Sequence, residues 1–162
     1  MQSKLRRISV FRTNVLEELH LYLNKTETVP SEPRSDLLKH NPNNEAWKIP
    51  VTMHDFPFTH NCIALIFSKK FVDSFILVLS PGTDYAVWRQ PNSKVYRCYI
   101  PIARVGSYNT GLWTESKRVQ HFHNGSVHFH KQSENHSLFN YSENTIYILV
   151  IDVLEQNSIR VI

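Results

Sequence analysis

Residues 75–83, with the sequence Phe-Ile-Leu-Val-Leu-Ser-Pro-Gly-Thr, decide the class of fold. The continuous apolar run Phe75–Leu79 predicts a strand that is covered on both faces. Pro81-Gly82 predicts a turn directly after that strand. Two further apolar runs, 95–102 and 145–153, predict additional strands. Short strands separated by turn signals are typical of a β-sandwich or barrel.

Two segments that precede these strands favour helices packed on the outside of the barrel. Residues 14–23 predict a short helix that Asn14 caps, with apolar residues on one face. Residues 59–71 predict a second helix that Thr59 caps, with a stripe of isoleucine and phenylalanine side chains. Residues 24–46 between them are rich in Pro, Asn and Ser and predict a surface loop.

The strand that follows this loop is predicted from Ile49, Val51 and Met53, which alternate with polar residues. The dense basic run Lys4-Leu5-Arg6-Arg7 is expected to be a solvated tail, because runs of charge are most often exposed.

Composition places the chain among globular proteins of one domain. It has 162 residues, of which 41% are hydrophobic, and a formal net charge of +4. This mild charge gives no reason to expect a nucleic-acid partner. No apolar run is long enough to cross a bilayer, so we expect a soluble, cytoplasmic protein without a membrane partner. Cys62 and Cys98 lie in apolar contexts and are expected to be reduced.

The segment from Gln120 to His130 predicts a β-hairpin around the two-residue turn Asn124-Gly125. In that register four imidazoles project from one face and the apolar side chains from the other. The four are His121, His123, His128 and His130. The favoured interpretation is an exposed polar face. The alternatives are a site for zinc, copper or nickel, or a pocket wall that can transfer protons if the face lines the barrel.

Four motifs in this order and spacing resemble the aspartyl/asparaginyl β-hydroxylases. They are Val78–Thr83 with its Pro-Gly-Thr turn, Arg97, His136, and the strand Leu149–Val153. The family consists of iron(II)- and 2-oxoglutarate-dependent oxygenases built on a double-stranded β-helix. The resemblance, over residues 45–154, implies a jelly-roll, cupin-like barrel with one or two flanking N-terminal helices. Residues 1–44 would pack on the barrel, and 45–162 would form it.

The resemblance also implies roles for individual residues. His136 falls on the distal iron ligand, Ser133 belongs to the same Ser-x-x-His motif, and Arg97 falls on the residue that holds the oxoglutarate carboxylate. A planar guanidinium suits that role because it grips a carboxylate with two hydrogen bonds.

Three positions depart from the family pattern. Trp88 stands in place of the proximal iron ligand, and an indole cannot ligate a metal as an imidazole does. Tyr99 replaces a histidine that contacts the cosubstrate, and Ile146 replaces the arginine that binds the far carboxylate of oxoglutarate. Asp84 shares the strand face of Trp88 by parity, so its carboxylate is a candidate replacement ligand for iron.

Two functions from different classes follow. The first is a derived enzyme that acts on a small carboxylate-bearing substrate in the pocket around Arg97, Tyr99, His136 and Trp88. It either keeps iron(II) through His136 and Asp84, with 2-oxoglutarate, or works without metal by using a histidine as acid or base. The alternative is an inactive pseudoenzyme that binds a ligand or a partner. A metal-binding module centred on the histidine hairpin is a third hypothesis.

Overall fold

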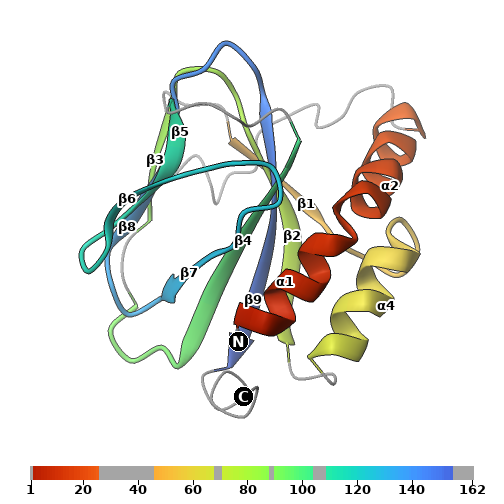
Figure 1. Cartoon of the computed structure of the whole chain (residues 1–162), viewed down its shortest axis with the longest axis horizontal. Helices are drawn as coiled ribbons and strands as arrows, with labels where there is room; N and C mark the ends of the chain where they lie inside the picture. The colour runs from red at the N-terminus through yellow and green to blue at the C-terminus, as the bar shows by residue number, and fades with distance from the viewer. Residues whose placement is uncertain (1, 26–45, 68–70, 88–89, 104–108, 155–162) are drawn as a thin grey trace.

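The computed structural model describes residues 2–25, 46–67, 71–87, 90–103 and 109–154. Two antiparallel β-sheets face each other (Figure 1). The five-stranded sheet has the order β1 (Ala46–Pro50), β2 (Phe71–Leu79), β9 (Ile146–Leu154), β4 (Val95–Ala103) and β7 (His128–Lys131). The four-stranded sheet has the order β3 (Thr83–Val87), β8 (His136–Asn140), β5 (Thr110–Thr114) and β6 (Arg118–His121).

The strands β2 to β9 follow the order of a jelly roll. Counted along the chain from β2, the first, eighth, third and sixth strands form one sheet. The second, seventh, fourth and fifth strands form the other sheet. Consecutive strands alternate between the two sheets, except for the paired fourth and fifth strands, and this order defines the double-stranded β-helix. The apolar runs that predicted strands at 75–79, 95–102 and 145–153 all form strands of the five-stranded sheet, so these predictions are confirmed.

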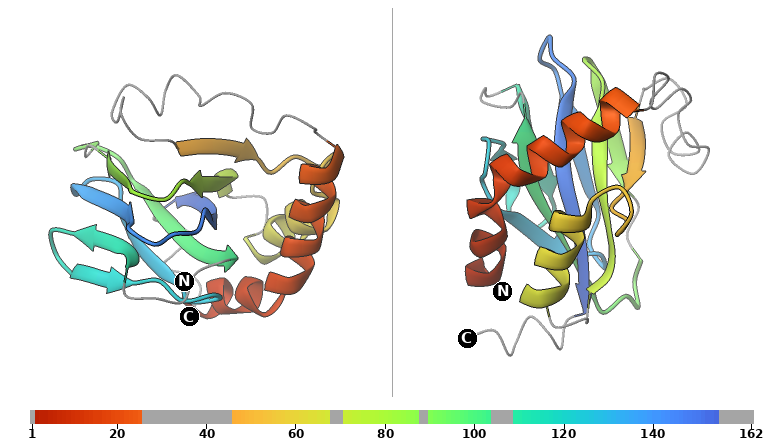
Figure 2. Two further views of the ribbon diagram at one scale, coloured as in Figure 1. Left: turned by 90° about the horizontal axis from the view of Figure 1, so that it is seen from above. Right: turned by 90° about the vertical axis from the view of Figure 1, so that its right-hand side faces the viewer.

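The helices of the described residues cover the outer face of the five-stranded sheet (Figures 1 and 2). They are α1 (Gln2–Val10), α2 (Arg12–Lys25) and α4 (Pro57–Ile66). The solvated tail predicted at Lys4–Arg7 is wrong, because these residues form part of α1. Leu5 and Ile8 of that helix are buried in the core layer between the helices and the five-stranded sheet. These two buried side chains lie one turn apart and anchor the short helix. The charged residues between them made the segment look like an exposed tail in the sequence.

The helices predicted at 14–23 and 59–71 are present with different ends. α2 starts at Arg12, so Asn14 lies inside it and is not its cap. α4 starts at Pro57, and a proline is well suited to the first turn because its missing N–H would be unpaired there. Thr59 lies inside α4.

The start of α4 is capped by a residue from another helix. Glu18 of α2 is buried and accepts hydrogen bonds from the backbone N–H groups of Phe58 and Thr59, at 2.8 and 2.7 Å. The Thr59 hydroxyl donates to the same carboxylate at 2.6 Å. A carboxylate satisfies the unpaired amides at a helix N-terminus and complements its dipole. Glu18 therefore fixes α4 against α2.

Alternation along the strands divides the core into two layers. On β9, Ile146, Ile148 and Val150 face the space between the sheets. Leu149 and Ile151 face the helices. Because both faces of the strand are covered, the sequence reads as a continuous apolar run. Ile146, which stands where the resembled family has an arginine, is fully buried in the inter-sheet layer.

Pro81-Gly82 forms the predicted turn, with Gly82 at a φ of +79°. The Gly82 N–H donates to the Asn140 backbone oxygen at 2.7 Å. The Asn140 side-chain nitrogen lies within 3.1 Å of the carbonyl oxygens of Leu79, Ser80 and Asn144. This fully buried amide ties the β2–β3 and β8–β9 turns together at one end of the barrel.

The hairpin predicted across residues 120–130 is wrong, although its turn is present. Gly125 has a φ of +81°, and the Ser126 N–H donates to the His123 carbonyl at 2.9 Å, as expected of a tight turn. The strands on either side do not pair with each other, because β6 pairs with β5 and β7 pairs with β4. In the jelly roll this is where the chain passes from one sheet to the other.

Three other predictions are settled by the structure. The strand predicted through Met53 ends at Pro50, and Met53 lies in an exposed turn. Cys62 and Cys98 are both free thiols, the second fully buried. No helix in the described ranges is long and apolar enough to span a membrane.

Most of the loop predicted at 24–46 lies outside the described residues.

Candidate functional site

Polar side chains gather at one end of the space between the two sheets. We call this group, formed by Arg97, Tyr99, His130, His136 and Asp152, the interior polar cluster. Strand register brings it together, because Arg97 of β4 lies opposite Asp152 of β9 on one side and His130 of β7 on the other. Residues opposite one another in a sheet share a face. His136 enters from β8, in the facing sheet.

Arg97 forms a bidentate ion pair with Asp152. Its Nε lies 2.8 Å from one carboxylate oxygen and a terminal nitrogen lies 2.9 Å from the other. Burial alone would lower the pKa of Arg97, but the hydrogen bonds and charge of Asp152 raise it above its usual value. The carboxylate that Arg97 grips in this structure is therefore one from its own chain. Binding of an external carboxylate by Arg97 stays a prediction.

Tyr99 and His136 are joined by a buried hydrogen bond of 3.0 Å between the phenol and Nε2. His136 Nδ1 lies 3.5 Å from the Glu134 carbonyl oxygen, a long contact that only a ring N–H could make favourably. In this arrangement Nδ1 carries the proton and the phenol donates to Nε2. Burial, followed by the charge of His130, lowers the pKa of His136 to about 2. Burial also raises the pKa of Tyr99, so both groups are neutral.

His130 stacks against His136, with ring centroids 3.7 Å apart. Its Nδ1 donates to the Lys131 carbonyl oxygen at 2.9 Å, which leaves Nε2 with a lone pair. Among the described residues, no atom forms a hydrogen bond with this buried Nε2. Burial lowers the pKa of His130, so the ring is neutral at pH 7. A buried lone pair without a protein partner is uncommon, and a bound water or a ligand can satisfy it.

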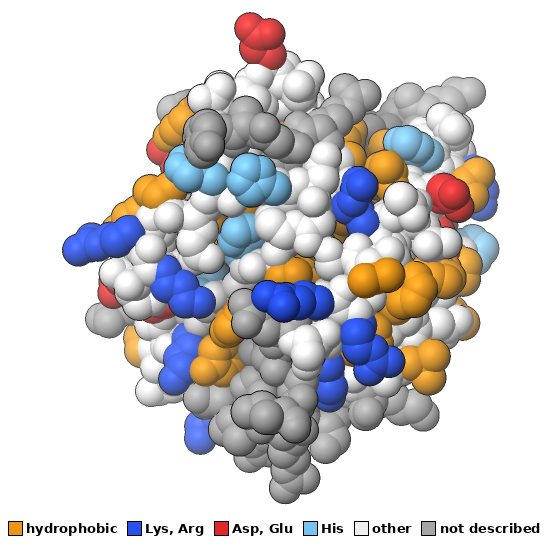
Figure 3. All heavy atoms as spheres, viewed as in Figure 1, with side chains coloured by type: hydrophobic (Ala, Val, Ile, Leu, Met, Phe, Trp, Pro, Cys, Tyr) orange, Lys and Arg blue, Asp and Glu red, His pale blue; other side chains and the backbone are white. Residues whose placement is uncertain are grey.

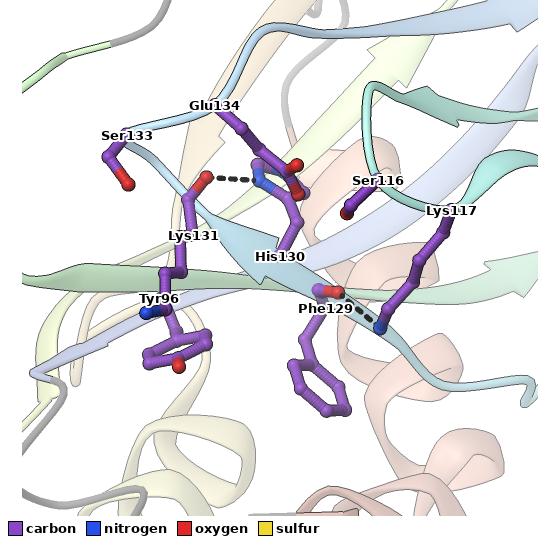
Figure 4. Close-up of a pocket in the computed structure, with 8 residues that line it drawn as sticks. All are labelled: Tyr96, Ser116, Lys117, Phe129, His130, Lys131, Ser133 and Glu134. Carbon is purple, nitrogen blue, oxygen red and sulfur yellow. Dashed lines mark hydrogen bonds between the residues drawn. The ribbon is translucent and has the colours of Figure 1, made fainter.

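A pocket of about 390 Å³ opens beside His130, at the edge of the barrel next to β7 (Figure 4). It is lined by Tyr96, Ser116, Lys117, Phe129, His130, Lys131, Ser133 and Glu134. The Lys117 ammonium donates to the Phe129 carbonyl at 3.3 Å. On the face of the molecule shown in Figure 3, several histidine side chains lie close together on the side away from the helices, whereas lysine and arginine side chains are spread over the whole face. The pocket combines apolar walls with cations, one carboxylate and an imidazole.

The residues present do not fit the iron site of the resembled family. The β3–β8 register places Val87 opposite His136 and Asp84 opposite Phe139. Asp84 and His136 are therefore on opposite faces of the sheet. Asp84 is exposed and accepts a hydrogen bond from the Tyr141 hydroxyl at 3.0 Å. Trp88 lies outside the described residues.

Ring spacing argues against His130 and His136 as a metal-binding pair. Two imidazoles on one metal, with metal–nitrogen bonds of about 2.0–2.1 Å, keep their centroids about 4.5–5 Å apart. The observed separation is 3.7 Å. Across the described parts of the chain, no group of three His, Cys, Asp or Glu side chains is arranged to hold a metal ion.

The exposed polar face favoured for the histidine segment is wrong, and the alternative metal site on it loses its basis, because the hairpin does not form. His128 and His130 belong to β7 and point between the sheets, where both are buried. His121 ends β6 in the other sheet, and His123 is exposed in the turn. Two of the four imidazoles thus line the barrel interior, as in the alternative interpretation of this segment.

Sequence reasoning brought Arg97, Tyr99 and His136 to one site, and the structure does the same. Ser133 lines the pocket beside His130. Asp152 was missed as a site residue, although a lone carboxylate in an apolar strand signals a buried partner of opposite charge. Lys117 and Lys131 were also missed, because an isolated surface lysine carries no signal in a sequence.

Comparisons with known proteins leave the family open. No family model matches the chain, and no curated protein matches it. Solved structures do resemble it. One is the cupin domain of an XRE family transcriptional regulator from Enterobacter cloacae, with 14% identity, a TM-score of 0.49, and coverage of 67% of this chain and 95% of that one.

Two further similarities are of the same kind. The EutQ protein of Clostridium difficile has 10% identity and a TM-score of 0.47, and the match covers 82% of this chain and 81% of that one. A predicted oxalate decarboxylase from Thermotoga maritima has 16% identity and a TM-score of 0.44, with coverage of 56% and 73%. At such low sequence identities and TM-scores, the assignment of the fold rests on the strand order of the chain itself.

Proposed function

We propose that this protein binds a small carboxylate-bearing molecule in the pocket beside β7, without iron, and that Nε2 of His130 contacts the bound molecule. One observation carries the proposal. His130 lines the pocket, and its Nε2 is buried, holds a lone pair, and has no hydrogen-bond partner among the described residues. Leaving a buried polar atom unpaired is costly, so a ligand that donates a hydrogen bond to it gains affinity.

The charges around the pocket support an anionic ligand with a hydrogen-bond donor. Lys117 and Lys131 line the pocket with ammonium groups, and both side chains are exposed. Cations at a pocket entrance attract a carboxylate. Glu134 is the acidic member of the lining, and its charge acts on His130 by favouring protonation of the ring. A ligand with a carboxylate at one end and a donor at the other complements this pattern.

A neutral imidazole in this position can also act as a general base. In this proposal His130 Nε2 accepts a proton from a carbon or hydroxyl group of a ligand held by the lysines, since His130 lines the pocket and this nitrogen holds a lone pair. Burial lowers the pKa of the adjacent His136 and keeps that ring neutral, so a charge on His136 does not oppose protonation of His130. We therefore favour a metal-independent acid–base enzyme over the oxygenase chemistry of the resembled family.

Thermal denaturation in EDTA with small dicarboxylates such as malonate and succinate tests binding. A ligand that binds only the folded state raises the melting temperature, and at 100 times its Kd it contributes about 2.7 kcal/mol. We expect a rise for the wild type and its loss in Lys117→Met/Lys131→Met. Lys25→Met, at the exposed end of α2, is the matched control and should respond as the wild type does. Equal responses in all three proteins would contradict the proposal.

Proton abstraction is tested separately by NMR in D₂O. If His130 acts as a base, deuterium enters the carbon next to the carboxylate of a bound ligand, and His130→Gln abolishes the exchange while retaining ligand-induced stabilisation. Binding without exchange in the wild type would assign the protein to the other class, a pseudoenzyme that binds a ligand.

A further inference from the structure

A second group of hydrogen-bonded side chains lies beside the Asn124-Gly125 turn, outside the interior polar cluster. Ser126 follows the turn, His128 begins β7, and Gln120 belongs to β6. Ser126 Oγ lies 2.7 Å from His128 Nε2, and His128 Nδ1 lies 3.2 Å from Gln120 Oε1. A hydroxyl, an imidazole and an oxygen acceptor in this order have the geometry of a nucleophile, its base and an orienting group.

The surrounding hydrogen bonds determine where the protons lie. Gln120 Oε1 can only accept, so His128 Nδ1 carries the ring proton and Nε2 presents its lone pair to Ser126. The His123 N–H donates to Ser126 Oγ at 3.0 Å. The hydroxyl proton is then shared between His128 Nε2 and the His123 carbonyl oxygen, which lies 2.7 Å away. Burial lowers the pKa of His128 to about 4, so the ring is neutral at pH 7 and its Nε2 holds a lone pair.

The two side chains differ in exposure in the way that such a site requires. His128 is only 8% exposed and packs edge-on against Phe122, with ring centroids 5.1 Å apart. Ser126 is half-buried and follows the exposed residues His123 and Asn124. Ser126 is therefore the more exposed of the two residues, and the base is the more shielded one.

We propose that Ser126 is a nucleophile for acyl transfer, with His128 as its general base and Gln120 as the positioning residue that orients the ring. Ser126 Oγ would attack the carbonyl carbon of an ester and pass its proton to Nε2. The single bond between the carbonyl carbon and the leaving-group oxygen breaks, and that oxygen takes the proton from His128. Water then hydrolyses the acyl-serine, so that one ester and one water give one acid and one alcohol.

The backbone around Ser126 limits the class of substrate. The Gly125 N–H donates to the Pro101 carbonyl at 2.8 Å, and the Ser126 N–H donates to the His123 carbonyl at 2.9 Å. Neither amide points freely at a developing oxyanion, which in hydrolases stabilises the transition state strongly. The site therefore suits activated acyl groups, such as aryl esters and thioesters, whose leaving groups need little assistance.

Labelling with a biotinylated fluorophosphonate, followed by mass spectrometry, tests the proposal on the full chain. The reagent bonds to serine oxygen and releases fluoride, so its rate reports the nucleophile. We expect the adduct on Ser126 and none in Ser126→Ala. His128→Phe should label at least about 100-fold more slowly, since it loses the general base. Ser137→Ala, a change at a half-buried serine of β8, should label at the wild-type rate.

Gln120→Glu keeps the test decisive if His128→Phe does not fold. In the described structure Nε2 of Gln120 is buried without a partner, so the carboxylate removes an unpaired donor and gives His128 Nδ1 a charged acceptor. This variant should label faster than the wild type, and Gln120→Ala more slowly. An adduct on another residue, or equal rates for the wild type, Gln120→Glu and Gln120→Ala, would overturn the assignment.

Discussion

Glu18 on α2 accepts two hydrogen bonds from Thr59 on α4, one from its backbone N–H at 2.7 Å and one from its hydroxyl at 2.6 Å. The residues are separated by 41 positions in the sequence. A carboxylate normally caps the helix to which it belongs, but here it caps a neighbour. This contact makes the packing of the two helices depend on one buried charge.

Replacement of Glu18 by Ala should therefore destabilise the protein strongly. The change leaves the Phe58 and Thr59 amides and the Thr59 hydroxyl without their acceptor, which we expect to cost about 2–4 kcal/mol. Urea denaturation followed by circular dichroism measures the loss. Glu17→Ala, at the adjacent exposed position, should change the free energy of unfolding by less than about 0.5 kcal/mol. Similar losses in both variants would argue against the cap.

Removal of one member of the Arg97–Asp152 pair should cost about 3–5 kcal/mol, because it leaves a buried charge unpaired. The double variant Arg97→Met/Asp152→Leu should recover much of that loss, and a double-mutant cycle measures the recovery. Asp73→Asn is the control. Asp73 lies 3.8 Å from the Lys48 ammonium but is 52% exposed, so its loss should cost less than about 1 kcal/mol. Additive losses at Arg97 and Asp152 would show that they act independently.

Asn140 is expected to be the most sensitive asparagine among the described residues. Asn140→Ala removes the donor to Leu79, Ser80 and Asn144 and should cost about 2–4 kcal/mol. Thermal melts of this variant and of Asn14→Ala give the comparison. Since α2 starts before Asn14, the second change should have little effect. A large effect at Asn14 would restore it as a helix cap.

Stability should fall as the pH is lowered from about 6.5, the usual pKa of histidine in an unfolded chain. Burial lowers the pKa of His128 to about 4 and that of His136 to about 2, so the folded state resists protons that the unfolded state binds. Each such histidine contributes stability that is complete above pH 6.5 and decreases by up to about 1.4 kcal/mol per pH unit below it. Urea denaturation at pH 7.0, 6.0 and 5.0 measures the slope.

A matched pair of variants assigns this slope to the buried rings. His136→Gln should reduce it by about one proton's contribution, whereas His20→Gln, at an exposed helix position, should leave it unchanged. A slope that is the same in all three proteins would mean that the acid sensitivity comes from other groups.

The strands β2, β4 and β9 of the five-stranded sheet could be predicted because their pattern is local. β4 and β9 are covered on both faces, so each appears as an uninterrupted apolar segment. The segment 120–130 shows the limit of such reasoning. Asn-Gly correctly indicated a turn, but the partners of β6 and β7 are β5 and β4, and nothing within the eleven-residue segment encodes them.

The site was predictable in part for the same reason. Resemblance placed Arg97 and His136 in one barrel, and they share the interior polar cluster. Which face Asp84 occupies depends on the register of β3 against β8, which a single sequence does not reveal. The partner of Arg97 likewise depends on the pairing of β4 with β9, fifty-five positions away.

The position of β9 between β2 and β4 has a consequence for how the chain acquires its structure. Both neighbours precede β9 in sequence. The centre of the larger sheet therefore cannot form until β9 pairs with them. Folding that depends on contacts between residues far apart in sequence is slow, because the chain loses conformational entropy before the stabilising contacts form. Until residues 146–154 have been synthesised, β2 and β4 leave apolar edges open, and nascent chains should depend on chaperones during that interval.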